Sequence, residues 1–371
     1  MEKKIPSGIK PKGKVYYDGL CTMCTSFVSR VGDPSHQSQF EYEDMHQSTL
    51  PEGLDMKAIE KEIHLVTEDG RVYKNSEAIL KILEGDRRYH IWSKIGKLPV
   101  IRQLLPVGYR FVANNRHLIF GAQGLSRLFW LKILICVGFI SSILLSLHLW
   151  VGERSFPLVP VIDNIALSII IESLVFVCLL LGLLGSIIYP RSRKYLILSI
   201  ISIAVLAFFD QMRWQPWVYQ YTFILVALSA VNWEKGDGSG YTALNISRII
   251  FVSIFIWSGI QKINPAFFDQ VYPWLSQPVL EVTPEILHGF ISKMGYLVTI
   301  MEIFIGIGLL VESLRKYALI ISVAMLGFLL FVLGPLGYNW NSVVWPWDIV
   351  MTLGVFILFY NANRFSLIQG I

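Results

Sequence analysis

The stretch Tyr17-Asp18-Gly19-Leu20-Cys21-Thr22-Met23-Cys24 decides the fold that we expect for the first part of the chain. It joins a short apolar run, Val15–Tyr17, to a Cys-x-x-Cys pair through an Asp-Gly turn. Two residues between the cysteines is the spacing of a first helical turn, so both sulfurs are expected close together at a helix N-terminus. The free backbone N–H groups and the helix dipole there favour a thiolate, which is the nucleophile in thiol–disulfide exchange. The pair therefore predicts redox chemistry in which Cys21 attacks and Cys24 resolves the mixed disulfide.

Two other interpretations of the pair stay open at this point, namely half of a metal site and two incidental cysteines. A structural zinc site needs about four ligands. The chain has no second Cys-x-x-Cys, and His36 and His46 lack the helical His-x-x-x-His spacing, so no metal-binding residue is predicted. Asp18 is the third candidate catalytic residue. It either assists proton transfer at the thiols or only shapes the turn.

The segments after this stretch predict a small α/β domain over residues 1–86. Asp69-Gly70 between two apolar runs is a strong hairpin signal. A later helix through Ala78 and Leu83 should be capped by Asn75 or Ser76. The expected elements are strands at Lys14–Tyr17, Gln39–Glu43, Ile63–Thr67 and Arg71–Tyr73, and a helix at Cys21–Val31. This order is that of a shortened thioredoxin-like fold.

The segment 87–127 combines cations with apolar residues. No acidic residue occurs between Arg87 and Gly152. Between residues 87 and 132 the chain has nine cations: Arg87, Arg88, Lys94, Lys97, Arg102, Arg110, Arg116, Arg127 and Lys132. Apolar residues interleave with them, which predicts amphipathic helices on an anionic membrane surface. An ordinary basic solvated face is the alternative. Nucleic-acid binding is not expected, because the basic run leads directly into a membrane span.

Composition indicates a membrane protein. The 371 residues are 54% hydrophobic with a mean hydropathy of +0.53, which is too apolar for a soluble chain of this length. Apolar runs long enough to cross a bilayer recur after residue 127, so we expect an all-α polytopic membrane helix bundle over 128–371. The eight expected spans are 128–150, 163–189, 195–209, 217–232, 244–262, 291–311, 316–334 and 343–360. The third and fourth are short, as in tilted or broken helices.

Basic loops predict the orientation of these spans. The loops around Arg191–Lys194 and Arg315–Lys316 fall on the same side as the basic N-terminal part if the number of spans is even. Met1–Lys14 is polar and lacks an apolar core, so no cleaved signal is expected. We therefore expect an integral protein of a bacterial inner membrane, with the N-terminal domain and the C-terminus in the cytosol.

Polar residues inside apolar spans are costly, so each marks a candidate site. Two places combine a cation, amides and aromatic rings where helices stop, which would suit a flat redox ring such as a membrane quinone. The candidate cofactor-binding residues are Asp210, Arg213, Trp214, Gln261, Lys262 and Glu302. An interfacial tryptophan belt with snorkelling cations is the alternative. Glu172 and Glu302 are expected either to pair with Lys or Arg or to line a cavity.

Cys136 and Cys178 lie at similar depths in the first two expected spans. They either relay electrons from Cys21 and Cys24 into the membrane or fill space as small apolar residues.

Residues 14–121 resemble the DCC family of predicted thiol–disulfide oxidoreductases. The resemblance depends on the segments Tyr17–Cys24, Asp69–Tyr73, Ser76–Ile79 and Asn115–Gly121. It departs from the family where Asp44-Met45-His46 replaces a Pro-Leu pair, and no proline precedes Ile63, where thioredoxin would have one. The resemblance implies a thioredoxin-like fold whose cysteines exchange electrons with a protein or small-molecule thiol or disulfide.

Residues 195–312 loosely resemble two membrane families. Gly259–Pro265, followed by Glu302–Leu310, resembles the DoxX/MauE group, which is linked to thiol and quinone redox chemistry. Ser258–Ile263 resembles the Gly-x-Lys-Lys-Leu motif of vitamin K-dependent gamma-carboxylase and its horizontally transferred transmembrane relatives. That resemblance implies that Lys262 is a base which activates a hydroquinone, while Gln261 replaces the first lysine of the motif.

These observations lead to three hypotheses. The first is a membrane-anchored thiol–disulfide oxidoreductase of the protein-disulfide reductase type, whose cytosolic pair exchanges electrons with a quinone or a membrane thiol partner. A cytosolic pair would be mostly reduced, which favours the reductase direction. The second is a quinone-dependent modifying enzyme with Lys262 as its base. The third is a non-enzymatic transporter or assembly factor with a redox-regulated domain.

Overall fold

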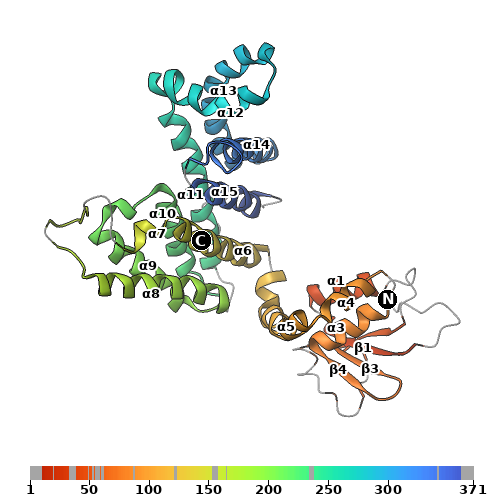
Figure 1. The fold of residues 1–371 in the computed structure, drawn as a ribbon. Helices are drawn as coiled ribbons and strands as arrows, with labels where there is room; N and C mark the ends of the chain where they lie inside the picture. Colours follow the sequence, from red (N-terminus) through yellow and green to blue (C-terminus); the bar gives the residue numbers. More distant parts are fainter. Residues whose placement is uncertain are drawn as a thin grey trace. The chain divides into compact units, whose positions relative to one another are not determined.

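The chain divides into two compact units, Met1–Ser126 and Arg127–Ile371. Figure 1 follows the elements of each unit along the chain. The computed structural model describes residues 11–19, 21–32, 39–48, 50–51, 54, 59, 62–86, 88–120, 123–152, 158–163, 165–233, 238–340 and 342–360.

The first unit contains a four-stranded mixed sheet in the order β2-β1-β3-β4. The strands are β1 Gly13–Tyr17, β2 Glu41–Asp44, β3 His64–Thr67 and β4 Val72–Lys74. β1 pairs in parallel with β2 and antiparallel with β3, and β3 pairs antiparallel with β4. Gly70 turns the expected hairpin with a φ of 77°, a conformation that glycine adopts without a steric penalty. The sheet and its order confirm the thioredoxin-like α/β expectation.

Helices α1 (Thr22–Val31) and α3 (Asn75–Glu84) supply apolar side chains to the core over the sheet (Figure 1). Val15 of β1 and Leu65 of β3 are fully buried against Ala78 of α3. Val15 and Leu65 are paired across the two strands and so point to the same face, whereas Tyr16, the next residue of β1, is buried on the other face with Met45 and Ile59.

The expectation that Asn75 or Ser76 caps α3 was wrong. The helix begins at Asn75 itself, and Lys74, the residue at the cap position, makes no side-chain capping bond. Strand β4 ends at Lys74, so no residue separates strand from helix. Asn75 makes the sharp change of direction with a φ of 45°, which asparagine tolerates better than most residues.

Helices α4 (His90–Gly96) and α5 (Pro99–Phe120) belong to the first unit. Tyr109 of α5 packs against the core, and its hydroxyl accepts a hydrogen bond from the Ile63 N–H at 2.9 Å. Both helices lie within the compact unit that extends to Ser126, and the finer boundary at residue 86 stays a prediction. The division falls at 126, beside the expected start of the membrane part.

The second unit is predominantly helical, as expected. Its helices before residue 262 are α6 Gln123–Leu145, α7 Leu147–Trp150, α8 Ile169–Ile188, α9 Arg193–Phe209, η2 Gln211–Arg213, α10 Pro216–Ser229 and α11 Gly238–Gln261. Those after it are η3 Phe267–Val271, α12 Tyr272–Val282, η4 Glu285–Leu287, α13 His288–Leu310, α14 Arg315–Leu333 and α15 Val344–Phe359.

Among the described residues, five helical segments are long and apolar enough to cross a bilayer. These are Leu125–Leu145, Ile169–Ile188, Ser239–Gln261, Glu285–Leu310 and Arg315–Leu333. The other expected spans are the shorter helices α9, α10 and α15, of 17, 14 and 16 residues. A 17-residue helix rises about 26 Å, less than the roughly 30 Å of a hydrocarbon core. The expected eight crossings are thus five long spans and three short apolar helices, so the orientation, which assumed an even number of spans, stays a prediction.

Candidate functional site

The site begins with Cys21, which immediately precedes α1 in an extended conformation. Its Sγ accepts a hydrogen bond from the backbone N–H of Cys24 at 3.4 Å. Its carbonyl accepts a helix-starting bond from the Thr25 N–H at 2.9 Å. Both cysteines are free thiols, and Cys21 is buried while Cys24 is partly exposed. The structure therefore places the reduced pair on the first turn of α1, the position that the spacing predicts.

The electrostatics of the pair distinguish its two sulfurs. The pKa of Cys21 is lowered to about 6, chiefly because the Cys24 thiol donates a hydrogen bond to it. Backbone N–H groups at the start of α1 and the charge of Arg116 act in the same direction, whereas burial opposes the shift. The pKa of Cys24 is raised, because Cys24 is the donor of that hydrogen bond and its thiol is partly buried. At neutral pH Cys21 is therefore mostly a thiolate, and Cys24 holds its proton.

Asp18 is buried at 6% exposure beside this pair. Its Oδ2 accepts a hydrogen bond from Arg116 Nη2 at 3.3 Å, and its Oδ1 is hydrogen-bonded to His46 Nε2 at 3.1 Å. Its carbonyl accepts from the Cys21 N–H at 3.2 Å, which forms the turn. Its charge also acts on Cys24, whose pKa it raises. Asp18 thus shapes the turn through its backbone, and its side chain is close enough to the thiols to influence their protonation.

Gly19 lets the turn approach the end of β2. Its N–H donates to Asp44 Oδ1 at 3.1 Å, and a Cβ at this position would lie 2.1 Å from Asp44 Oδ2. The same Asp44 carboxylate accepts from the backbone N–H of His46 at 3.0 Å. Asp44 therefore holds together the turn that carries Asp18 and the loop that carries His46.

Sequence reasoning missed Arg116 and His46 as members of this site. Arg116 appeared only as one cation of a basic segment, and it meets Asp18 across 98 positions of sequence. His46 was considered only as a metal ligand, and it reaches Asp18 across 28 positions. The one available signal was the place of Arg116 inside the segment Asn115–Gly121, which resembles the DCC family.

The first group of candidate cofactor residues lies between α9 and α10. Arg213 is 1% exposed and forms an ion pair with Glu172 of α8. Asp210 accepts from the Met212 N–H at 3.2 Å, and Trp214 stacks on a neighbouring tyrosine. The guanidinium of Arg213 also donates to the carbonyls of Leu149, Trp150 and Leu206, at 3.1, 3.3 and 2.7 Å. These contacts cross-link the chain around a break between two short helices.

The second group lies at the end of α11. Lys262 Nζ donates to Glu302 Oε2 of α13 at 2.8 Å and to Ser258 Oγ at 2.6 Å. Gln261 is exposed, and its carbonyl accepts a hydrogen bond from Asn264 at 2.6 Å. Glu302 thus pairs with a cation, as Glu172 does, which decides between the two alternatives expected for these carboxylates.

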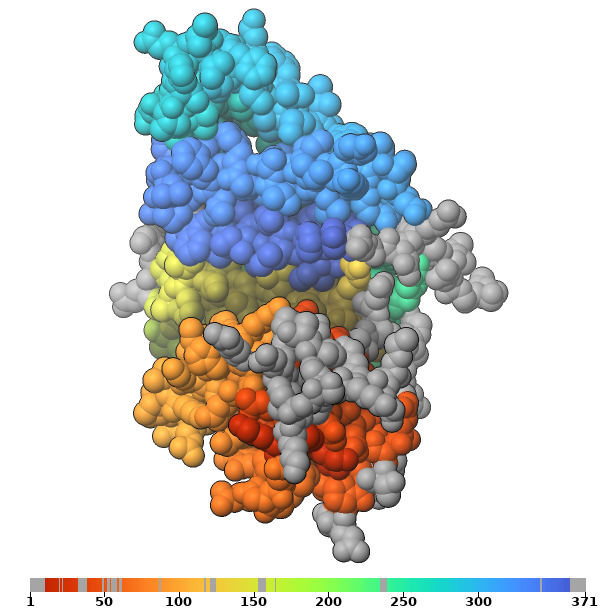
Figure 2. Space-filling model, turned by 90° about the vertical axis from the view of Figure 1, so that its right-hand side faces the viewer, coloured from red at the N-terminus to blue at the C-terminus, as the bar shows by residue number. Residues whose placement is uncertain are grey.

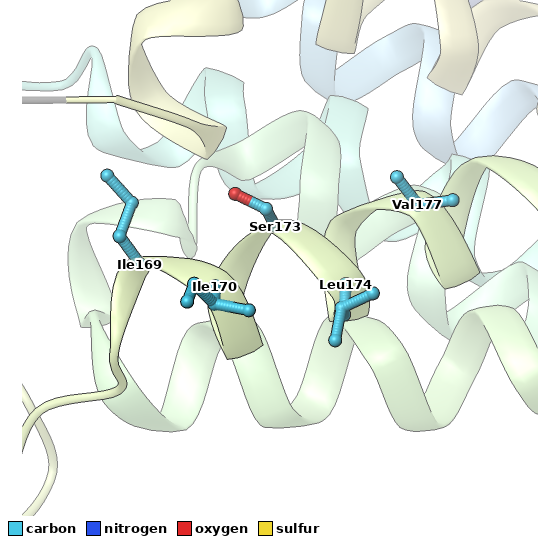
Figure 3. A pocket seen from close by; sticks show the side chains of 5 residues that line it. All are labelled: Ile169, Ile170, Ser173, Leu174 and Val177. Carbon is cyan, nitrogen blue, oxygen red and sulfur yellow. The ribbon is translucent and has the colours of Figure 1, made fainter.

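The six candidate residues therefore belong to two groups of contacts on different helices. An open apolar groove runs along α8, and it involves neither group. Its lining residues are Ile169, Ile170, Ser173, Leu174 and Val177 (Figure 3). Because these side chains all come from one apolar helix, we assign no function to the groove.

Cys136 and Cys178 are free thiols of the second unit. Cys136 is fully buried in α6, and Cys178 is partly buried in α8. Both are packed as small apolar residues would be, and the electron relay stays a prediction.

Comparison with protein families gives one match in each of the two compact units. Residues 15–122 match the family model of the DCC1-like thiol-disulfide oxidoreductases, and residues 241–342 match that of the methylamine utilisation protein MauE. Searches of curated proteins and of solved structures found no match. The first match contains the cysteine pair, Asp18 and Arg116. The second contains Lys262 and Glu302, whereas the group around Arg213 lies outside both.

Proposed function

We propose that the protein is a membrane-anchored protein-disulfide reductase. The chain carries a DCC1-like thiol–disulfide oxidoreductase domain, which is followed by a MauE-like membrane domain. Its coarse function is that of a membrane thiol–disulfide oxidoreductase acting on thiols or disulfides. The observation that carries the finer proposal is the asymmetry of the pair. Cys21 accepts hydrogen bonds, and its pKa is lowered. Cys24 donates a hydrogen bond, and its pKa is raised.

The reaction starts when the Cys21 thiolate attacks a substrate disulfide. A bond forms between Cys21 Sγ and one substrate sulfur, the substrate disulfide breaks, and its other sulfur leaves as a thiolate. Cys24 then loses its proton and attacks Cys21 Sγ, which closes the Cys21–Cys24 disulfide and releases the second substrate sulfur. Two electrons pass from the pair to the substrate, whose two sulfurs leave as thiolates and take up protons from water.

Asp18 is the group that we expect to accept the proton of Cys24. Its carboxylate is buried beside the thiols, and Arg116 and His46 hold it in place. The His46 side chain is 30% exposed, so it connects the buried carboxylate to water. A proton leaving Cys24 would therefore reach solvent through Asp18 and His46.

We also infer that the membrane unit returns electrons to the pair from a quinol or a membrane dithiol. A bound quinol would supply two electrons and two protons, which reduce the Cys21–Cys24 disulfide. Lys262 Nζ and Ser258 Oγ would hold an oxygen of such a ring, which would replace one of the acceptors that Lys262 has now. Support comes from the place of Lys262 in the MauE-like region, with Nζ 5.8 Å from the centroid of the Phe267 ring. A cytosolic pair in a bacterial inner membrane belongs to this proposal, and with eight spans Lys262 lies at the opposite membrane face, so the electrons cross the bilayer on their way to the pair.

No observation favours Lys262 as the base of a carboxylase-like enzyme. A base needs a free lone pair, whereas Lys262 donates to Glu302 and Ser258. Lys262 could act as a base only after its hydrogen bonds to Glu302 and Ser258 had opened and it had lost a proton.

Trapping of the mixed disulfide tests the proposal. The full-length Cys24→Ser variant should accumulate a covalent adduct through Cys21 with a disulfide substrate such as oxidised glutathione or an oxidised protein. The Cys21→Ser variant, which keeps the other thiol, is the matched control and should form none. Equal adduct formation by both variants, or turnover by Cys21→Ser, would rule out the assigned roles. Addition of a quinol or of a dithiol to the oxidised wild-type protein then identifies the electron donor.

A further inference from the structure

We propose that the outer face of α4 and α5 docks on the surface of an anionic lipid bilayer. This face consists of Ile91, Trp92, Ile95, Val100, Leu104 and Val107, and is called the α4–α5 face below. The docking is independent of the redox chemistry, so its test does not depend on the proposed function.

The α4–α5 face is apolar and exposed over two successive helices. Val100, Leu104 and Val107 are 70%, 62% and 65% exposed, and Trp92 is 60% exposed. The three residues of α5 follow the spacing i, i+4 and i+7, so they form one stripe along the helix. An apolar stripe of this extent on two neighbouring helices is typical of an interaction surface. In Figure 2 this segment, in orange, forms part of the exposed surface of its unit.

The charges around the face favour an anionic partner. The exposed cations on the same two helices and just before them are Arg88, Lys94, Arg102 and Arg110. Lys97 is excluded from this set, because it pairs with Glu84 at 2.8 Å. No acidic residue lies between Arg87 and Gly152 to offset these charges. At 100° per residue Lys94 and Arg110 lie roughly a quarter turn from the apolar residues of their own helices, which is the pattern of a helix lying among anionic headgroups.

The covalent connection favours a bilayer over another protein. Helix α5 ends at Phe120, and the first membrane-spanning segment begins at Leu125. A fully extended chain of this length reaches only about 17 Å, so the end of α5 cannot lie far from a membrane surface. A lipid surface is therefore always within reach of this part of the protein.

Docking would also position the thiol pair. The inner face of α5 is occupied by the first unit, because Tyr109 binds the Ile63 N–H and Arg116 binds Asp18. The same helix thus carries the stripe on its outside and, on its inside, a core residue, Tyr109, and a residue of the redox site, Arg116. A bilayer that holds the stripe would set the distance of Cys21 from the membrane.

A fluorescent label tests the docking in the full-length chain. Leu104→Cys is labelled with an environment-sensitive dye after the native thiols have been removed by Cys21→Ser, Cys24→Ser, Cys136→Ala and Cys178→Ala. The protein is reconstituted into vesicles of phosphatidylcholine alone or with one quarter phosphatidylglycerol. In the mixed vesicles we expect a blue-shifted emission and at least twofold quenching by a lipid-borne quencher. The matched control is Val72→Cys on β4, which is also exposed, at 45%, and should be quenched in neither vesicle.

Further variants separate the possible occupants of the face. Lys94→Glu with Arg110→Glu should abolish the quenching at position 104, and a label at position 100 should behave like the one at 104. Equal solvent exposure of positions 104 and 72 in both vesicles would overturn the proposal. A blue shift that rises with protein density and ignores lipid charge would also overturn it, and would identify a second copy of the chain as the occupant.

Discussion

Replacing Cys24 by alanine should raise the pKa of Cys21, because it removes the thiol that donates a hydrogen bond to Cys21 Sγ. That bond is the largest cause of the lowered pKa, and the backbone bond at 3.4 Å and the charge of Arg116 remain. With a pKa of about 6, about nine-tenths of Cys21 is thiolate at pH 7. A rise of the pKa by one unit would leave about one half of Cys21 as thiolate at pH 7, and a rise by two units about one tenth.

The assay is the rate of alkylation of Cys21 by iodoacetamide between pH 4 and 10. Mass spectrometry of the peptide that contains Cys21 separates this thiol from the other cysteines. The rate at pH 7 should fall two- to tenfold in Cys24→Ala and recover at high pH, because the thiolate is the reacting form. Cys24→Ser is the matched control: its hydroxyl still donates a hydrogen bond, so the midpoint should move less. An unchanged midpoint in both variants would refute the assignment of this hydrogen bond as the main cause.

The remaining predictions concern the groups around the pair and the membrane unit. Arg116→Gln should raise the pKa of Cys21 by a few tenths to about one unit, and Arg116→Lys by less, since only the first removes the charge; an alkylation midpoint that fails to rise in Arg116→Gln would contradict the electrostatic role. Gly19→Ala should cost about 1–2 kcal/mol in the free energy of unfolding, because the new Cβ would displace the Asp44 carboxylate and its hydrogen bonds; an unchanged denaturation midpoint would show that the carboxylate moves aside freely. Glu302→Gln should cost about 2 kcal/mol by leaving Lys262 without its ion-pair partner, and thermal unfolding should show that the double variant with Lys262→Met is more stable than Glu302→Gln alone.

The local features of the chain were predictable from its sequence. The cysteine spacing, the Asp69-Gly70 hairpin and the apolar run of β1 act over a few residues, so neighbouring side chains suffice to determine them. Long apolar runs likewise indicate membrane helices, because the cost of burying polar groups in lipid applies to each segment separately. The exception was the start of α3, where the direct passage from β4 left no room for the expected cap.

Only the tertiary structure decided which distant residues complete each site. Arg116 joins Asp18 because α5 packs against α1 and α3, and no local pattern states which face of a helix will meet a residue 98 positions away. The same reason applies to Lys262 and Glu302, which meet because α11 packs against α13. The sequence by itself determined a reactive pair of sulfurs and an apolar membrane part. Packing between elements determined the charges that surround those sulfurs, because an electrostatic environment depends on distances in space rather than along the chain.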